Sequence, residues 1–133
     1  MNRMSLFVIG LLSACLCTYA CTVGPAKTKD ISVAVTVPDL GWRIRIQEIY
    51  QVGEELWVIS VLSRIPGVAA QMVTTVSDTV SATVPVLPVK HVVLGKTWGW
   101  RNKEDYVFVT NIREIDEHLK AGKLLFQRDK NGE

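Results

Sequence analysis

The chain has 133 residues, which is enough for one domain and too few for two comfortable ones. Hydrophobic residues make up 48% of it, so we expect a packed core and no extensive disorder away from the ends. With 15 basic against 13 acidic residues the net charge is only +2, which argues against a nucleic-acid-binding protein.

The N-terminal residues have the layout of a bacterial export signal. One positive charge, Arg3, precedes an apolar run over residues 5–12 that is too short for a permanent membrane anchor. The stretch Leu12-Ser13-Ala14-Cys15 resembles the lipobox of bacterial lipoproteins. That resemblance implies cleavage before Cys15 and acylation of its sulfur, which would anchor the mature protein in a membrane.

Cys21 is an alternative end of the signal, because Thr18-Tyr19-Ala20 before it suits either ordinary signal peptidase or a poorer lipobox. An ordinary cleavage would give a secreted protein. All three cysteines of the chain, Cys15, Cys17 and Cys21, lie in this segment, so we expect no disulfide and no cysteine metal site in the folded part. The predicted organisation is a signal peptide at 1–14, a lipid anchor and tether at 15–30, one β-rich domain at 31–128 and a frayed tail at 129–133.

A first strand is predicted at residues 31–37, where large apolar and small residues alternate up to Pro38. A hairpin then begins at Trp42. Apolar and polar residues alternate strictly over 42–47, which is typical of a strand with one buried face. Gly53 supplies the turn. The second arm, 56–62, is apolar on both faces except at Ser60, so it should be a central buried strand.

Further strands are predicted at 69–84, 89–94, 106–109 and 124–126. In the first of these, the even-numbered residues from Met72 to Ala82 should share one face, with a break near Ser77-Asp78. One helix is predicted after Asn111, which can cap it, with Glu114 completing a capping box. Gly122 would end this helix in a left-handed conformation.

An apolar stripe at helical spacing supports that helix; its members are Ile112, Ile115 and Leu119. Together these elements predict a mostly β fold, a small antiparallel β-sandwich or open barrel with one C-terminal α-helix.

The candidate binding residues are Trp98, Trp100 and Arg101. The two tryptophans flank Gly99 in a polar stretch with few apolar neighbours, so we expect at least one indole to be exposed. Tryptophan and arginine are favoured at protein-binding hot spots, which makes this loop a candidate recognition surface. The alternative is a lid that closes the end of the sheet. Trp42 and Trp57 are expected in the core.

The residues give little support for catalysis or metal binding. His91 and His118 are too few for a zinc site, and Glu114 with His118 reads as a surface pair on a helix. A triad could be written from Ser77 or Ser81, His91 and Asp78, but neither serine lies in a nucleophile turn. We therefore expect a non-enzymatic protein with no cofactor and no metal.

Residues 41–93, about 40% of the chain, resemble the C-terminal domain of PrcB-type lipoproteins, which accompany proteases of the cell envelope. The shared features are Gly41-Trp42 with Ile44 and Ile46, the turn at Gly53, the Val-rich arm to Leu62, Pro66-Gly67 and Pro88-Val89-Lys90. The resemblance implies a non-catalytic, membrane-tethered module that binds a protein.

The expected function is thus a lipid-anchored cell-envelope protein, facing the periplasm, that binds another protein or envelope component. One alternative is a small-ligand carrier with an apolar cavity between its strands. The other is a small hydrolase using His91 and Asp78.

Overall fold

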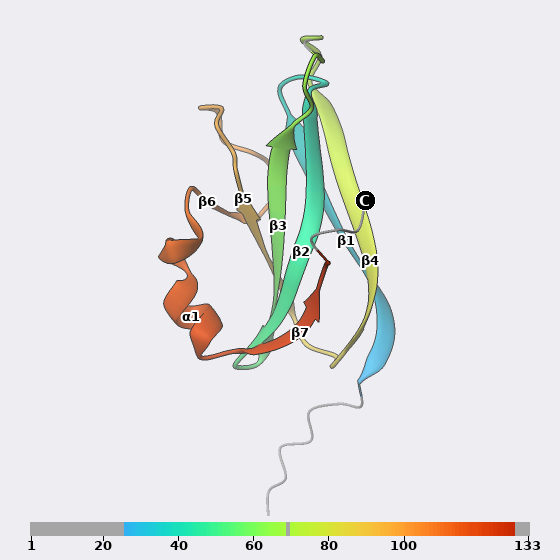
Figure 1. Cartoon of the computed structure of the whole chain (residues 1–133), viewed down its shortest axis with the longest axis vertical. Helices are drawn as coiled ribbons and strands as arrows, with labels where there is room; N and C mark the ends of the chain where they lie inside the picture. The colour runs from blue at the N-terminus through green and yellow to red at the C-terminus, as the bar shows by residue number, and fades with distance from the viewer. Residues whose placement is uncertain (1–25, 69, 130–133) are drawn as a thin grey trace, which may run out of the picture.

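The computed structural model describes residues 26–68 and 70–129, in which the chain forms seven strands and a short helical segment (Figure 1). The predicted signal peptide and both candidate lipidation sites, Cys15 and Cys21, lie outside these residues. The elements are β1 (Lys27–Val37), β2 (Trp42–Val52), β3 (Glu55–Arg64), β4 (Thr74–Val84), β5 (Val89–Leu94), β6 (Val107–Val109), the 3-10 turn η1 (Ile112–Glu114), α1 (Asp116–Lys120) and β7 (Lys123–Gln127).

The strands form two sheets, a pair β1-β4 and a five-stranded sheet in the order β6-β5-β3-β2-β7. The predicted mostly β sandwich with one helix is confirmed, and the described strands do not close into a barrel. The pairs β1-β4, β2-β3 and β2-β7 are antiparallel, whereas β3-β5 and β5-β6 are parallel. The β3-β5 pair is parallel because β4, between them in sequence, belongs to the other sheet. The chain runs back along β4, and β5 then has the same direction as β3.

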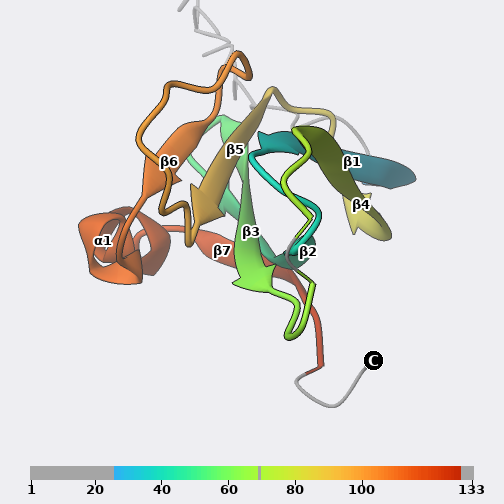
Figure 2. The same cartoon turned by 90° about the horizontal axis from the view of Figure 1, so that it is seen from above.

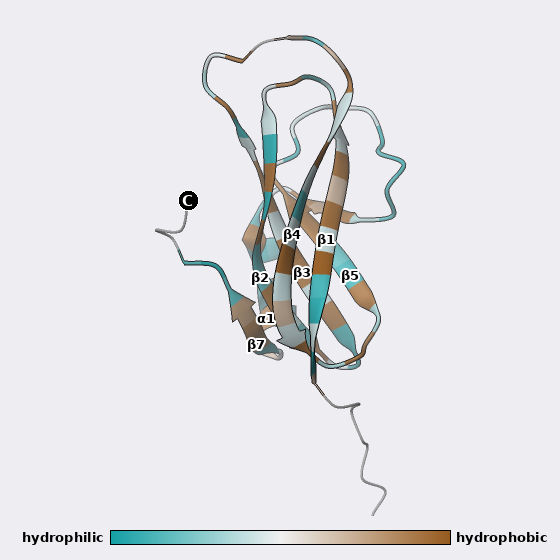
Figure 3. Ribbon diagram, turned by 90° about the vertical axis from the view of Figure 1, so that its right-hand side faces the viewer, coloured by the Kyte–Doolittle hydropathy of each residue, from teal (hydrophilic) through white to brown (hydrophobic). Residues whose placement is uncertain are grey.

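The core lies between the two sheets and is built by alternation along each strand. Every second residue of β1 from Ile31 to Val37 is buried, and so are Val80, Ala82 and Val84 of β4. Figure 3 shows the resulting bands of hydrophobic and hydrophilic residues along these strands. The even-numbered residues of β4 share one face, as predicted, and the structure turns that face toward the core.

The five-stranded sheet is covered on both faces, so β3 at its centre is buried from Leu56 to Ser60, as predicted. Its second face packs against α1 through a smaller apolar cluster: Trp57, Ile59, Val92, Val109, Ile115 and Leu119. Figure 2 shows the helix on one side of this sheet and β1 and β4 on the other. The molecule therefore has three layers around β3.

The β2-β3 hairpin turns at Gly53, which has a φ of +59°. This left-handed conformation is the one that glycine adopts at little cost, as the sequence predicted. A β-bulge between Ile46 and Glu48 shifts the register of β2 against β3. Because the bulge adds one residue, the buried positions continue from Ile46 to Ile49 instead of Glu48.

Two predicted strand boundaries are wrong. β1 begins at Lys27 instead of residue 31, so the predicted tether at 15–30 overlaps the sheet. β4 begins at Thr74 and runs without a break through Ser77 and Asp78. Both of these residues pair with β1, Ser77 with Ala34 and Asp78 with Val33, so the polar residues interrupt the apolar pattern without interrupting the backbone ladder.

The predicted single helix is divided into η1 and α1 at Ile115, whose φ is −117°. Asn111 does cap η1, since its side chain accepts a hydrogen bond of 3.0 Å from the backbone N–H of Arg113. The prediction for Gly122 is wrong: positive φ values among the described glycines occur at Gly53, Gly67 and Gly95. Gly122 is instead required by a close approach, because a Cβ there would lie 2.8 Å from the carbonyl oxygen of Gln51.

No helix in the described part of the chain is long and apolar enough to cross a membrane.

Candidate functional site

The loop at residues 95–106 joins β5 to β6 and is fastened to the free edge of β1. A Glu104 oxygen accepts hydrogen bonds from the backbone N–H of Thr36 (2.8 Å) and from its hydroxyl (2.7 Å). The Asn102 amide donates to the Thr36 carbonyl at 2.8 Å and to Glu104 at 3.0 Å. Side chains of the loop thus satisfy backbone groups that an edge strand leaves open, and they fix the position of the loop.

The charge of Glu104 strengthens this attachment. Burial acts to raise the pKa of Glu104, but hydrogen bonds outweigh it and hold the pKa below its usual value; they come from the Thr36 hydroxyl, the Glu104 backbone, and the Asn102 and Thr36 amides. Glu104 is therefore ionised at neutral pH. Charge-assisted hydrogen bonds of this kind are stronger than neutral ones.

The predicted site residues Trp98 and Trp100 lie in this loop and have different surroundings. Trp98 is half-buried and packs edge-on against Trp42, with ring centres 5.2 Å apart. Its indole N–H donates to the Asn102 side chain at 2.9 Å. Trp100 follows in the same stack, 5.5 Å from Trp98, and is 40% exposed. Trp98 thus closes the end of the core, as the lid alternative expected, whereas Trp100 is the exposed member of the pair.

Trp100 and Arg101 line one surface pocket of about 380 Å³, together with Thr36, Val73 and Lys103. The structure therefore brings two of the three predicted site residues together, and Trp98 stands behind them. Arg101 and Lys103 are exposed, so an apolar floor of Trp100 and Val73 has cationic neighbours. This combination is typical of the centre and rim of a protein interface.

Other exposed apolar residues belong to the connections at the same end of the sandwich. We define the apolar tip as Leu40, Ile65, Val68, Met72, Val73 and Trp100. They come from the β1-β2, β3-β4 and β5-β6 connections, which lie together at the top of Figure 1. Met72 and Val73 are 61% and 65% exposed. No pattern in the sequence marked the first five as a binding surface, although the apolar residues around Pro66-Gly67 were a signal that could have found them.

Backbone hydrogen bonds hold two of these connections together. The N–H of Leu40 donates to the carbonyl of Ala70 at 3.0 Å, and the N–H of Ile65 donates to the carbonyl of Gly41 at 2.7 Å. At the same place the Arg64 guanidinium donates to both carboxylate oxygens of Asp39, at 2.7 and 2.9 Å. These hydrogen bonds and the ion pair fix the backbone conformation at the base of the tip. That conformation therefore does not require the apolar side chains of the tip to be buried.

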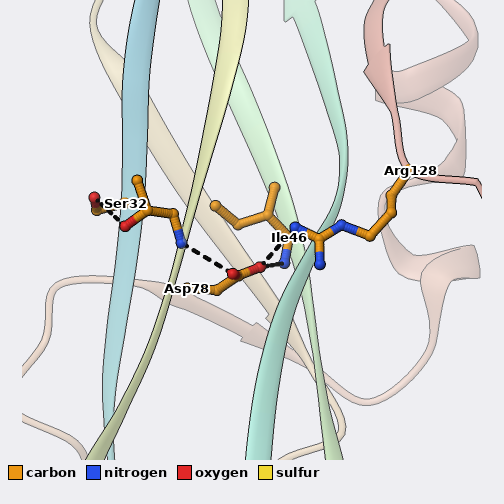
Figure 4. Close-up of polar contacts among 5 residues, drawn as sticks. Ser32, Ile46, Asp78 and Arg128 are labelled. Carbon is orange, nitrogen blue, oxygen red and sulfur yellow. Dashed lines mark hydrogen bonds and ion pairs between the residues drawn. The ribbon is translucent and has the colours of Figure 1, made fainter. Parts of the chain in front are cut away.

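The residues of the possible Ser-His-Asp triad are not joined by hydrogen bonds. Asp78 accepts hydrogen bonds from the backbone N–H of Ile46 at 2.8 Å and from Arg128 at 3.0 Å, as Figure 4 shows. The Ser81 hydroxyl donates to Asp30. The His91 ring packs on Tyr106 at 4.6 Å, and burial lowers its pKa. No interaction within the described residues joins His91 to Asp78 or to either serine.

The predicted surface pair, Glu114 and His118, is exposed as expected, but its members belong to different helical segments. Glu114 ends η1, while His118 lies on α1 and packs against Trp57 with ring centres 5.2 Å apart. Within residues 26–68 and 70–129 no three His, Cys, Asp or Glu side chains gather where they could hold a metal ion.

No protein-family model, curated protein or solved structure matches this chain. The fold and the site define it as a two-sheet β-sandwich with a helix on its outer face and an apolar tip built from three connections.

Proposed function

We propose that the chain is an exported, lipid-anchored protein of the cell envelope, and that its domain binds another protein through the apolar tip without catalysing a reaction. One observation carries the proposal: six exposed apolar residues from three connections gather at one end of the sandwich. Soluble proteins rarely gather several exposed apolar side chains at one end of the molecule unless something binds there. Arg101 and Lys103 add the polar rim that interfaces carry.

The direction of the strands supports a membrane tether. β1 begins at the end of the sandwich opposite the apolar tip, as Figure 1 shows. A lipid at Cys15 or Cys21 would precede β1 by a short segment, so the tip would point away from the membrane that holds the anchor. This orientation would make the tip available to a partner in the periplasm.

Site-specific photo-crosslinking in cells tests the binding surface. A photoreactive amino acid at Met72, on the tip, should give a discrete crosslinked protein, because partner atoms would lie against that side chain. The same amino acid at Glu54, exposed in the hairpin turn at the other end, is the matched control. Trp100→Ala should abolish the crosslink from Met72, since truncating an interface anchor costs about 2 kcal/mol or more of binding. The same product from both positions, or no product from Met72, would contradict the proposal.

Labelling with a fatty-acid analogue tests the anchor. Cys15→Ala should abolish incorporation, because the thioether-linked acyl chains need that sulfur. Loss in Cys21→Ala with labelling retained in Cys15→Ala would instead place the anchor at Cys21. A wild-type chain that takes up no label would be an ordinary secreted protein.

A further inference from the structure

The charged residues around the apolar tip are unevenly distributed. The β3-β4 connection, residues 65–73, contains no charged residue. In the β1-β2 connection Asp39 is neutralised by Arg64, which donates to both of its carboxylate oxygens at 2.7 and 2.9 Å. In the β5-β6 connection, by contrast, Arg101 and Lys103 line the pocket of about 380 Å³, whose described lining includes no carboxylate. The positive charge is therefore confined to one margin of the tip.

Both of these cations are available to a ligand. Arg101 and Lys103 are exposed, and neither makes an ion pair with another residue in the described part of the chain. Glu104, beside them, has each carboxylate oxygen engaged in hydrogen bonds. Asp105 lines a neighbouring pocket of about 180 Å³. The loop at residues 95–106 contains three cations against these two carboxylates, so its net charge is positive.

Hydrogen bonds and stacking hold this margin in place before a partner arrives. Asn102, between the two cations, is 7% exposed and donates to the Thr36 carbonyl at 2.8 Å, which leaves its neighbours on both sides at the surface. Lys96 donates to the carbonyl of Trp100 at 2.8 Å, and the ring of Trp100 stacks on Trp98. A surface that is ordered in advance loses less conformational freedom when it binds.

We propose that the partner of the apolar tip presents an acidic protein segment to this margin. An apolar side chain of the segment contacts Trp100 and Val73. Adjacent carboxylates accept charge-assisted hydrogen bonds from Arg101 and Lys103, and the planar guanidinium can donate two in parallel. The inference rests on the proposed protein-binding role of the tip and adds the chemistry of the partner. Because the charge lies on one margin, it also fixes the orientation of the bound segment.

A membrane with anionic lipids would also attract cations and bury apolar side chains. Two observations favour a protein segment. The tip lies at the end of the sandwich opposite the start of β1, where an N-terminal anchor would enter (Figure 1). A flat lipid surface would meet every margin of the tip, whereas the cations gather at only one of them.

Binding of designed peptides to the full chain, held in phosphatidylcholine nanodiscs, tests the inference. The acidic probe is a fluorescein-labelled peptide with one benzoylphenylalanine, a photoreactive apolar residue, between pairs of aspartates. The matched probe has lysines in place of the aspartates. By fluorescence polarisation the acidic peptide should bind about tenfold or more tightly than the lysine peptide, and the difference should shrink as salt is added. Irradiation should join the benzoylphenylalanine to Val73 or to the loop at 95–106, as mass spectrometry of the digested product shows.

Removal of charge at two places tests the role of the margin. Arg101→Gln combined with Lys103→Gln should weaken binding of the acidic peptide by about tenfold or more. Lys29→Gln combined with Arg113→Gln is the matched control, because it removes the same charge from exposed positions on β1 and η1 outside the tip. Its affinity should stay within about twofold of wild type. All four side chains are exposed, so both variants should keep the wild-type melting temperature.

Equal binding of the two peptides, equal losses in the two variants, or a crosslink elsewhere on the chain would overturn the acidic partner. Tighter binding of dihexanoyl phosphatidylglycerol than of the acidic peptide would also overturn it and would assign the margin to anionic lipid. The crosslink from Met72 in cells does not depend on these peptides. If it forms while the acidic peptide fails to bind, the tip keeps its protein-binding role and the acidic partner is excluded.

Discussion

At the scale of single residues, two tryptophans only two positions apart have different roles. Trp98 packs against Trp42 and uses its indole N–H to bind Asn102, so it belongs to the wall of the core. Trp100 extends the same aromatic stack to the surface and lines a pocket with Arg101. Residues at i and i+2 would share one face of a regular extended segment. This loop instead takes its shape from the hydrogen bonds that Asn102 and Glu104 make to Thr36 of β1, so the two rings differ in exposure.

Alanine substitution separates these two roles. Trp98→Ala should lower the free energy of unfolding by about 2–4 kcal/mol, because it leaves a cavity beside Trp42 and takes away the donor to the Asn102 side-chain oxygen. Trp100→Ala should cost about 1 kcal/mol or less, since that ring is 40% exposed. Equilibrium urea unfolding of both variants measures the difference. Equal losses would show that both rings support the core and would remove the basis for a binding role of Trp100.

His91 predicts a pH dependence of stability. Burial lowers its pKa below the usual 6.5, so the unfolded chain binds this proton more readily than the folded one. The contribution of His91 to the free energy of unfolding should then be complete well above pH 6.5 and fall as the pH drops through 6.5, by at most about 1.4 kcal/mol per pH unit for one proton. His91→Phe keeps a ring against Tyr106 and should flatten this slope between pH 7.5 and 5.5. An unchanged slope in His91→Phe would show that another group carries the pH dependence.

At the scale of elements, the helical segment shows how packing overrides a repeating pattern. Ile112, Ile115 and Leu119 are spaced for one helical face, yet the helix breaks at Ile115. Ile115 and Leu119 pack against the second face of the large sheet, whereas Ile112 remains exposed on η1. The helical segment changes direction at Ile115, after β6. As a result Ile115 and Leu119 pack in one cluster with Trp57 and Val92 of the sheet.

The division of this segment predicts unequal effects of two isoleucines. Ile115→Ala should cost about 2–4 kcal/mol of stability, because the side chain is 6% exposed and packs in a cluster. Ile112→Ala should cost about 1 kcal/mol or less, because that side chain is 40% exposed. Thermal or urea unfolding of the pair decides the matter. Similar losses would mean that a single continuous helix buries both residues.

At the scale of the whole molecule, the two sheets are joined at both margins by side chains instead of backbone ladders. On one margin Asp78 of β4 accepts from the backbone of β2, and on the other Asn102 and Glu104 bind the backbone of β1. These contacts satisfy edge groups that would otherwise invite pairing with another chain. They keep the sandwich from opening without closing it into a barrel.

Removal of one of these links should weaken the whole domain. Glu104→Ala should cost about 1–3 kcal/mol, since the Thr36 N–H loses its acceptor. Because the pKa of Glu104 is lowered from 4.5, its contribution is present above that pH and is lost as the pH falls through the folded-state value. Hydrogen exchange of the Thr36 amide should accelerate in the variant. Asp105→Ala, which changes an exposed neighbour, should leave stability within about 0.5 kcal/mol of wild type.

The sequence alone determined the features that depend on neighbouring residues. Alternation with a period of two identified the strands and their inner faces, and the doubly apolar arm at 56–62 identified the central strand. Gly53 and Asn111 were recognisable because a left-handed turn and an N-cap each depend on one residue type. The polarity around Trp98 and Trp100 was likewise enough to predict that one indole is exposed.

Only the tertiary structure decided how these elements pair and which surfaces they form. Alternation shows which face of a strand is buried but does not show its partner, so the parallel β3-β5 pair could not be derived from it. The apolar tip draws on three connections, and one polar pocket is lined by residues 43, 78 and 128 from β2, β4 and the segment after β7. Such groupings depend on long-range pairing and layer packing, which leave no local pattern in the sequence that a period or a motif could reveal.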